Sequence, residues 1–335
     1  MEYNQDTLRD SFGRLITYLR LSITDRCNLR CFYCMPQADF NWMPPRKILR
    51  FEEIVQLTRV LAKLGVKKVR FTGGEPLVRK DVVKLVADVN GLDGIKETCL
   101  TTNGVLLRSL ASELFNAGLR HLNISLDTLR AKRFEQITGR DFFHQVWEGI
   151  EKSLELGFSP VKINFVMMRG KNDDEVVDFA RLAQRFDLEV RFIEFMPIGK
   201  HSKWGKQHFL SSDEAKSLIE QELGRLVPVR REDDAGPADM YSLHGSAGKV
   251  GFISPLSHRF CSSCNRLRVT ADGRVRLCLF SDLEFELRDL LRKGISDSHL
   301  SHFFSEIILR KPARYLTAKK KDVPSCDRQM SSIGG

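Results

Sequence analysis

The stretch ITDRCNLRCFYCMPQ, from Ile23 to Gln37, follows a short run of alternating apolar residues and places Cys27, Cys31 and Cys34 at CxxxCxxC spacing. Three thiolates can ligate three irons of a four-iron cluster, which normally takes four cysteines. The fourth iron would then be open to another ligand, and a metal with an open position is a reactive one. A zinc site or three ordinary thiols are the alternatives, because spacing alone gives false positives.

Outward from this stretch, short apolar strands alternate with amphipathic helices. The pattern predicts strands at Leu19–Thr24, Val66–Thr72, Glu97–Thr102, Leu119–Leu126, Val161–Met167 and Glu189–Met196. It predicts helices at Phe51–Leu64, Val82–Val89, Val105–Ala117, Arg130–Ile137, Val146–Leu156 and Asp174–Phe186. Strand–helix units in series are typical of a parallel sheet with right-handed crossovers. We therefore predict an α/β fold: a partial (β/α)6 TIM barrel of parallel strands with a smaller C-terminal domain.

Four of the predicted strands alternate apolar with polar side chains. The polar positions are Arg20, Ser22 and Thr24; Lys68, Arg70 and Thr72; His121, Asn123 and Ser125; and Lys162 and Asn164. Because successive side chains point to opposite faces, the apolar face can take the helices and the polar face the lumen. The sequence thus predicts an open barrel whose cationic lumen holds an anionic ligand. An antiparallel sheet with a wet polar face is the alternative, which the intervening helices disfavour.

Conspicuous short sequences follow the predicted strands, where the active sites of such barrels lie. They are the cysteine motif, Gly73–Gly74–Glu75–Pro76, Thr102–Asn103–Gly104, Ser125–Leu126–Asp127 and Glu194–Phe195–Met196–Pro197. A Gly-Gly pair alone predicts only a turn, but glycine also lets a backbone approach a ligand closely. On the same rim as the cysteines, we expect a ligand contact.

A second cysteine triplet lies in RFCSSCNRLRVTADGRVRLCLF, which carries Cys261, Cys264 and Cys278. The turn at 271–273 predicts a hairpin that brings Cys278 back beside the CxxC pair. The triplet fits either a zinc site, completed by His258 or Cys326, or a second three-thiolate cluster. Arg266 and Arg268, two apart on a strand, are expected on one face, where they could bind an anion or simply meet solvent.

The overall composition excludes several classes of protein. No apolar run is long enough for a transmembrane helix, and the N-terminus lacks a signal peptide, so we expect a cytoplasmic protein without disulfides. The net charge of +10 fits a solvated basic surface, which we favour for Lys319–Lys321, or attraction to phosphorylated ligands. A nucleic-acid-binding module is the alternative from another class, although no RNA-binding signature is visible. The lone Cys99 and Cys326 are expected to be a buried thiol and a tail thiol.

Several motifs together carry a family resemblance. CNLRCFYC, FTGGEP, TTNG, NISLDTL and FIEFMP resemble the radical S-adenosylmethionine (SAM) superfamily. VKINFVMMRGKND, CSSCNRLRVTADGRVRLC and the final Gly334–Gly335 resemble, more closely, the GTP 3′,8-cyclase family of molybdenum cofactor biosynthesis. The resemblance spans nearly the whole chain. It implies a radical SAM core over residues 11–235 and a C-terminal domain over residues 236–335.

The resemblance also implies roles for individual residues. Cys27, Cys31 and Cys34 would hold a [4Fe–4S] cluster that binds SAM and cleaves it to a 5′-deoxyadenosyl radical. The implied SAM contacts are Tyr33, Gly74, Ser125 and Met196. The implied GTP contacts are Arg20, Arg70, Thr101 and Lys162 in the barrel, with Arg266, Leu267 and Arg268 beside the second triplet. Cys261, Cys264 and Cys278 would hold a second [4Fe–4S] cluster that takes the guanine end of GTP.

The implied activity is that of a radical SAM lyase. The radical would remove the ribose C3′ hydrogen of GTP, and C3′ would then bond to guanine C8, giving (8S)-3′,8-cyclo-7,8-dihydroguanosine 5′-triphosphate. The implied partners are a one-electron donor such as flavodoxin or ferredoxin and the downstream cyclic pyranopterin monophosphate synthase, with no nucleic acid and no membrane. The chain would be a monomer or homodimer.

A radical SAM enzyme that modifies a peptide is the alternative. The Gly-Gly end would be able to enter the cavity, although a frayed terminus is the default.

Overall fold

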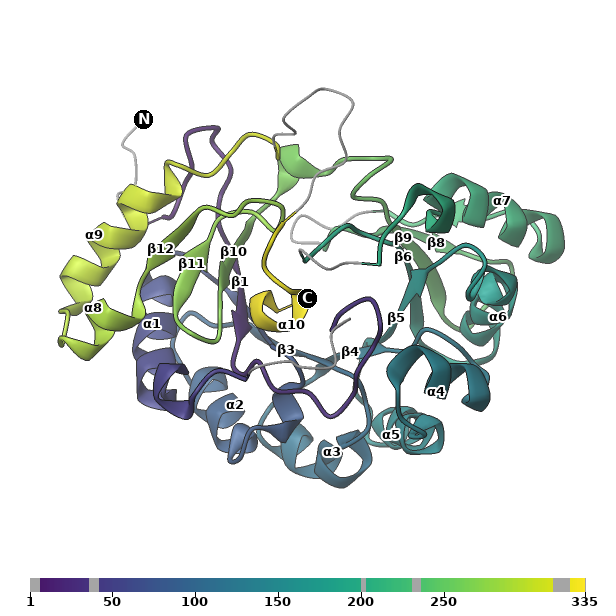
Figure 1. Ribbon diagram of the computed structural model, residues 1–335, viewed down its shortest axis with the longest axis horizontal. Helices are drawn as coiled ribbons and strands as arrows, with labels where there is room; N and C mark the ends of the chain where they lie inside the picture. The colour runs from purple at the N-terminus through teal and green to yellow at the C-terminus, as the bar shows by residue number, and fades with distance from the viewer. Residues whose placement is uncertain (1–6, 36–41, 200–202, 231–235, 316–325, 335) are drawn as a thin grey trace.

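A computed structural model of the chain describes residues 7–35, 42–199, 203–230, 236–315 and 326–334. Its centre is a run of parallel strands in chain order: β1 (Tyr18–Ser22), β2 (Lys68–Thr72), β3 (Glu97–Thr102), β4 (His121–Ser125), β5 (Val161–Met167) and β6 (Glu189–Glu194). The connecting helices are α1 (Phe51–Lys63), α2 (Val82–Asn90), α3 (Leu107–Asn116), α4 (Ala131–Thr138), α5 (Phe143–Glu155) and α6 (Val176–Arg185). Figure 1 shows these helices lining the outside of the curved sheet. The predicted α/β architecture is confirmed.

The C-terminal part of the chain widens this same sheet at both edges. β10 (Arg266–Val269) pairs in parallel with β1, and β9 (Lys249–Ile253) pairs in parallel with β6. The outer strands are antiparallel: β11 (Arg274–Arg276) and β12 (Glu284–Glu286) beyond β10, and β8 (Asp239–Ser242) and β7 (Val227–Pro228) beyond β9. The domain boundary predicted between residues 235 and 236 remains a prediction, because 231–235 lie outside the described residues.

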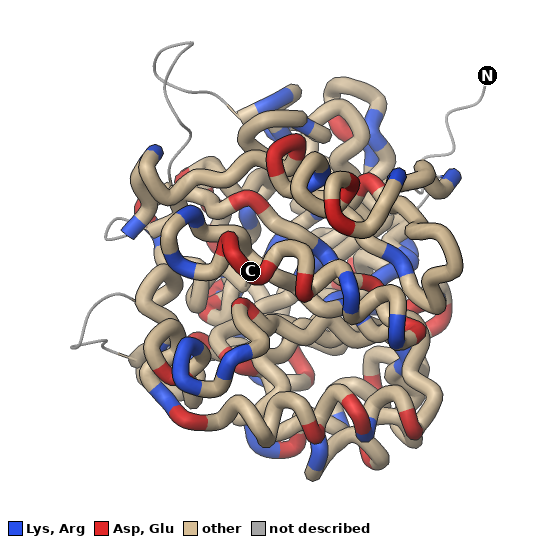
Figure 2. The backbone as a smooth tube through the Cα atoms, turned by 90° about the vertical axis from the view of Figure 1, so that its right-hand side faces the viewer, with Lys and Arg blue, Asp and Glu red and all other residues tan. Residues whose placement is uncertain are grey.

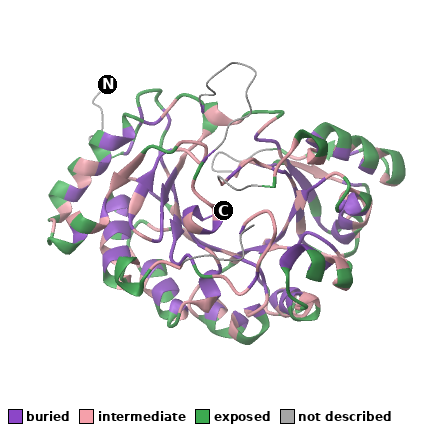
Figure 3. Cartoon of the chain, in the orientation of Figure 1, coloured by how far each residue is buried: buried purple, intermediate pink, exposed green. Residues whose placement is uncertain are grey.

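The predicted alternation of side chains along the strands holds. Leu19, Leu21 and Ile23 are fully buried in the core between strands and helices. Phe165 of β5 stacks on Phe179 of α6, with ring centroids 4.1 Å apart. Figure 3 shows the same division, with buried residues on the strands and on the inner faces of the helices and exposed residues outside. The opposite, polar face of the strands is therefore left for the lumen.

Four further helices complete the fold. α7 (Ser212–Leu223) packs against α6, and α8 (Arg288–Arg292) and α9 (Asp297–Ile308) contact α1, while α10 (Met330–Ile333) lies near the C-terminus. Helix α7 begins with a capping box, in which the Ser211 hydroxyl accepts from the Glu214 amide at 3.2 Å and the Glu214 carboxylate accepts from the Ser211 amide at 3.0 Å. Such a cap typically contributes about 1 kcal/mol. Within the described parts of the chain, no helix is long and apolar enough to cross a membrane.

The last described residues return to the middle of the barrel. Figure 1 places α10 inside the curve of the sheet. The Gly334 carbonyl accepts a hydrogen bond of 2.8 Å from Arg268 of β10, and a Cβ on Gly334 would lie 2.5 Å from Thr72 of β2. Gly334 is thus buried in the lumen rather than frayed, whereas Gly335 lies outside the described residues.

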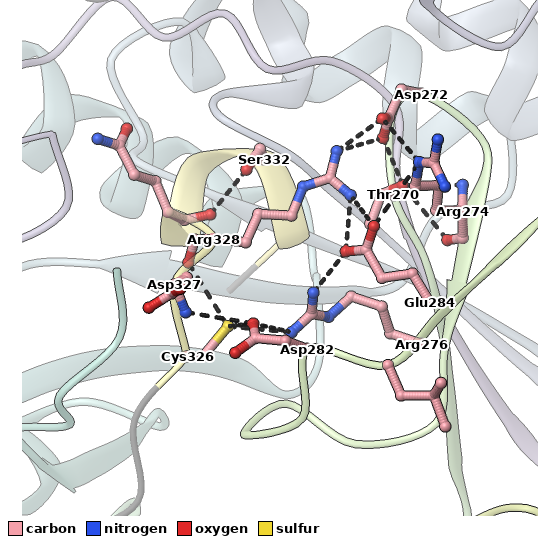
Figure 4. Close-up of polar contacts among 12 residues, drawn as sticks. Thr270, Asp272, Arg274, Arg276, Asp282, Glu284, Cys326, Asp327, Arg328 and Ser332 are labelled. Atoms are coloured by element: carbon pink, nitrogen blue, oxygen red, sulfur yellow. Dashed lines mark hydrogen bonds and ion pairs between the residues drawn. The ribbon is translucent and has the colours of Figure 1, made fainter. Parts of the chain in front are cut away.

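An ion-pair network holds the segment that precedes α10 (Figure 4). Arg328 bonds both carboxylate oxygens of Asp272, each at 2.7 Å, and both of Glu284, at 2.8 and 2.9 Å. Beside it, Arg276 donates to the Cys326 sulfur at 3.0 Å. Cys326 is therefore a buried hydrogen-bonded thiol, and not the tail thiol that the sequence suggested. Because these partners are on the β10–β11–β12 extension, the extension fixes where the tail enters the lumen.

The charged residues of the face shown in Figure 2 do not segregate by sign, and Lys and Arg lie interspersed with Asp and Glu. Such interspersed positions along the backbone form no single-sign track of the kind that nucleic-acid binding uses. Lys319–Lys321 lie outside the described residues. The cationic residues that bear on function are those in the lumen.

Candidate active site

The first cysteine loop packs directly on the Gly73–Gly74 turn that follows β2. The Gly74 amide donates to the Thr24 carbonyl and the Glu75 amide to the Arg26 carbonyl, both at 2.7 Å. A Cβ on Gly73 would lie 2.3 Å from the Thr24 oxygen, and one on Gly74 would lie 2.3 Å from the Arg26 oxygen. The glycine pair is thus required where two main chains meet, directly before Cys27. Its predicted contact with a ligand stays a prediction.

The three thiols of this loop lie close to one another. Burial raises the pKa of Cys27 to about 11 and that of Cys34 to about 12, and it raises the pKa of Cys31 well above its usual value. The neighbouring Cys34 and Cys27 add to the shift at Cys31, since two adjacent thiolates repel. Together the thiols can ionise only beside a cation, and a metal centre supplies one.

A four-iron cluster fits this arrangement. Among the described residues, no three His, Cys, Asp or Glu side chains converge closely enough to hold a single metal ion. A zinc ion needs such convergence, with Zn–S distances of about 2.3 Å. In a four-iron cluster each thiolate binds a different iron, so the three sulfur atoms need not converge on one point. The predicted cluster at the first loop therefore stays a prediction.

Polar contacts tie the cysteine loop to the ends of β3 and β4. The Tyr33 hydroxyl donates to Asp127, which follows β4 and also accepts from the Val166 amide at 2.9 Å. Asn103, after β3, donates to the Asn28 side chain at 2.7 Å. These bonds bring the rim sequences together as predicted. Asp127 was noticed in the sequence but received no role.

A single cavity in the lumen collects the cations that strand alternation predicted. Arg20, Arg70 and Lys162 line it, together with Lys68 and Arg191, which were not among the predicted site residues. Burial, with a contribution from the neighbouring Arg191, lowers the pKa of Lys162 to about 8, and burial lowers that of Arg20 to about 10. Several buried cations in one space favour an anion as occupant.

Arg70 is the most thoroughly anchored of these cations. Its guanidinium donates to the Tyr18 hydroxyl, to the Asn123 side chain at 2.6 Å and to Thr101 at 3.4 Å. The strands on either side of β2 thereby hold one charged group in a fixed position. Thr101 thus lies beside Arg70 but is not among the residues that line the cavity, so its predicted ligand contact stays a prediction.

The second cysteine triplet opens onto the same cavity. Cys261, Cys264 and Cys278 line it, with Arg266 and Arg268 from β10. Burial acts to raise the pKa of Cys264, but the positive charges of Arg266 and Lys311 outweigh burial and lower it to about 6. A thiolate is the form that binds metal. The cavity therefore joins a cationic lumen to a second cysteine triplet, whose predicted role in metal binding stays a prediction.

The two predicted fourth ligands of a zinc site have other partners. His258 is exposed and lies 2.8 Å from an Asp213 oxygen through Nε2, while Cys326 is held by Arg276. Neither residue lines the cavity. Their placement favours a three-thiolate centre at the second triplet.

The remaining predicted contacts are distributed around this space. Met196 lines the cavity, and Ser125 is at the end of β4 on its polar face. Leu267 is different, because its side chain is fully buried in the hydrophobic core on the other face of β10. Any contact of Leu267 with a ligand must use its main chain. Arg14 and Lys311 also line the cavity and escaped the sequence analysis, because both lie outside recognisable motifs.

In metal-free protein at pH 7, we expect iodoacetamide to modify Cys264 at least about 10-fold faster than Cys278. The reason is that burial raises the pKa of Cys278, whereas that of Cys264 is about 6. The rate at Cys264 should fall as the pH is lowered from 7 to 5, because the thiolate is then protonated. Peptide mass spectrometry measures both rates, with Arg266→Gln expected to slow Cys264 and the exposed Lys293→Gln to leave it unchanged. Equal rates at the two cysteines would contradict the assignment.

Comparison with known proteins gives the same picture. Residues 21–183 match the family model of the radical SAM superfamily, and residues 188–317 match that of Molybdenum Cofactor Synthesis C. The chain is 44% identical over 329 residues to the GTP 3′,8-cyclase of Thermodesulfovibrio yellowstonii, which covers 98% of this chain and 100% of that protein. It is 47% identical to the GTP 3′,8-cyclase of Pelotomaculum thermopropionicum, with the same coverage.

Among solved structures, Streptococcus suis SuiB bound to S-adenosylmethionine aligns with a TM-score of 0.65 and 15% sequence identity. The alignment covers 92% of this chain and 70% of SuiB. At this identity the likeness supports the fold alone.

Proposed function

The chain belongs to the GTP 3′,8-cyclase family of radical SAM enzymes, and from this we propose that it converts GTP to (8S)-3′,8-cyclo-7,8-dihydroguanosine 5′-triphosphate. This reaction is the first step of molybdenum cofactor biosynthesis, which agrees with the match of residues 188–317. The observation that carries the proposal is one cavity lined both by buried cations and by a cysteine triplet. A nucleotide with a triphosphate at one end and a base at the other suits such a cavity.

Cys27, Cys31 and Cys34 would hold the cluster at the rim of the barrel, with Tyr33, Gly74, Ser125 and Met196 around SAM. When bound, this cluster and SAM would supply a 5′-deoxyadenosyl radical able to take the ribose C3′ hydrogen of GTP, which is the chemistry that formation of a C3′–C8 bond requires. The contribution of the chain is to fix the distance and orientation between SAM and GTP. Such positioning can be worth several orders of magnitude in rate.

The lumen residues Arg20, Arg70, Thr101 and Lys162 would bind GTP in the barrel. Guanidinium and ammonium groups form strong charge-assisted hydrogen bonds with phosphate. The anion would in turn raise the pKa of Lys162 and hold it charged, since its pKa is only about 8 in the free protein. Binding of the triphosphate would therefore offset the repulsion among the lumen cations. This favourable electrostatic energy favours a highly charged ligand.

Cys261, Cys264 and Cys278 would hold a second [4Fe–4S] cluster, with Arg266, the main chain of Leu267 and Arg268 beside the guanine end of GTP. The support for a cluster over zinc is the position of His258 and Cys326, each of which has another polar partner. A reactive carbon radical requires exclusion of bulk water, and a bound nucleotide inside the barrel would contribute to this.

The proposal extends to the surroundings of the enzyme. We expect a cytoplasmic protein that receives single electrons from a donor such as flavodoxin or ferredoxin, as a monomer or homodimer. The product would pass to cyclic pyranopterin monophosphate synthase. A mixed-sign surface and a cationic interior agree with a small nucleotide as substrate rather than a nucleic acid.

The test is an anaerobic incubation of reconstituted, reduced protein with SAM and GTP. We expect about eight irons per chain, 5′-deoxyadenosine, and a product that is an isomer of GTP, with the same mass but a different chromatographic retention. Formation of 5′-deoxyadenosine while GTP stays unchanged would point to another substrate, such as a peptide. Four irons per chain, or zinc at one site, would contradict the two-cluster arrangement.

A further inference from the structure

Lys311 follows helix α9 and is almost fully buried, with 3% of its surface exposed. Its ammonium group donates to the Arg266 carbonyl at 2.8 Å and to the Leu277 carbonyl at 2.5 Å. Arg266 is two residues after Cys264, and Leu277 directly precedes Cys278. One side chain therefore bridges the two limbs of the β10–β11 hairpin that carry these cysteines.

Carbonyl groups accept the hydrogen bonds of Lys311 but do not balance its charge. Among the described residues, no carboxylate forms an ion pair with it, and Arg14 and Arg266 nearby are also positive. A buried ammonium without an opposite charge is strongly unfavourable. Cys264 and Cys278 lie on the two limbs that Lys311 bridges, so a metal centre held by them would place its negative charge beside this ammonium group.

We propose that Lys311 is a positioning residue for the second metal centre: it ties the two cysteine limbs together and holds a buried positive charge against the cluster. The proposal rests on the second cluster of the proposed function. A three-thiolate four-iron centre carries net negative charge that grows on reduction, so an adjacent cation stabilises the reduced form and raises the reduction potential.

The backbone around Lys311 is built to hold it in place. The Lys311 amide donates to the Ile308 carbonyl at 2.9 Å, and the Pro312 and Ala313 carbonyls accept from Arg14 at 2.7 and 3.1 Å. Arg14 also donates to the Cys261 carbonyl at 2.7 Å. The segment that carries Lys311 is thereby fixed to the third cysteine as well, and its ammonium group has little freedom to leave the site.

The experiment uses the full chain with Cys27, Cys31 and Cys34 all replaced by alanine, so that only the second centre can form. Iron content and an EPR-monitored redox titration are compared for this protein and for Lys311→Gln, Lys311→Arg and Lys311→Met. The exposed Lys293→Gln is the matched control for loss of one positive charge. We expect Lys311→Gln to shift the midpoint potential to more negative values and Lys311→Arg to keep it near the parent value. Lys311→Met should lose, in addition, at least about half of the four irons.

The outcomes separate the two proposals. If the parent protein binds no iron–sulfur centre, the second cluster of the proposed function is wrong. If the centre forms and Lys311→Gln has the same potential as Lys293→Gln, the role of Lys311 is wrong. If circular dichroism shows that Lys311→Gln fails to fold, Lys311→Arg is the deciding variant. A midpoint potential of Lys311→Arg equal to that of the parent supports the proposal, and a shifted midpoint potential overturns it. If both variants fail to fold, Lys311 has only a structural role in the core, and the proposal is also overturned.

Discussion

Replacement of Cys278 by alanine is expected to abolish conversion of GTP while SAM is still bound and cleaved. Cys278 lines the cavity, whereas none of the three cysteines of the first loop does, so its loss should leave the first centre intact. We expect GTP conversion to fall at least about 100-fold, equivalent to about 2.7 kcal/mol of transition-state stabilisation. Uncoupled formation of 5′-deoxyadenosine should persist, and chromatography of both products measures the two effects in one reaction.

The matched control is Cys99→Ala, which removes a thiol outside both triplets. Cys99 is fully buried, as the sequence suggested, and donates to Glu97 at 2.9 Å. This variant should keep both activities. If Cys278→Ala instead lost SAM binding to the same extent as GTP conversion, the second triplet would be a structural site that supports the whole barrel.

The second large effect is expected for Arg70→Gln. Truncation of one partner of a buried charge pair costs about 2–5 kcal/mol, so the KM for GTP should rise at least about 30-fold. Because Tyr18, Asn123 and Thr101 hold the guanidinium within the lumen, the loss should appear in substrate binding, with SAM binding unchanged. Steady-state kinetics over a range of GTP concentrations, with equilibrium binding of SAM in parallel, measures both.

An exposed arginine provides the control for Arg70. Arg59 of α1 faces solvent, and Arg59→Gln removes the same charge without touching the lumen. Its KM for GTP should stay within about twofold of the parent value. A similar KM in Arg70→Gln and Arg59→Gln would show that the lumen cations do not bind the triphosphate.

The central strands were predictable because their information is local. Short apolar runs between amphipathic helices identified β1 to β6, and alternation along β1, β2, β4 and β5 also separated the apolar face from the lumen face. Arg191 carries the same local signal, since it stands two residues after Glu189 on β6 and opposite Asn164 of β5 in register. The same alternation, applied to the sixth strand, would have found it.

Long-range features carried no local signal. The parallel pairing of β10 with β1 joins segments that are far apart in the chain. Nothing in the sequence of either strand identifies its partner. Lys311 lies in a connection after a helix, where nothing in KPARY marks a buried ammonium. Cys326 was assigned by its position near the end of the chain, whereas its burial depends on Arg276 of β11. Such residues become visible only when the sheet has been assembled.

The pairing of β10 with β1 has a consequence for biogenesis. A ribosome delivers the chain from its N-terminus, so the loop of Cys27, Cys31 and Cys34 emerges long before the strand that covers the outer edge of β1. The tail that fills the lumen, up to Gly334, emerges last. Until β10 has been synthesised, the outer edge of β1 is therefore unpaired, and we expect iron–sulfur donors to reach the first cysteines during this interval. Pairing of strands so distant in sequence is slow, which lengthens that interval further.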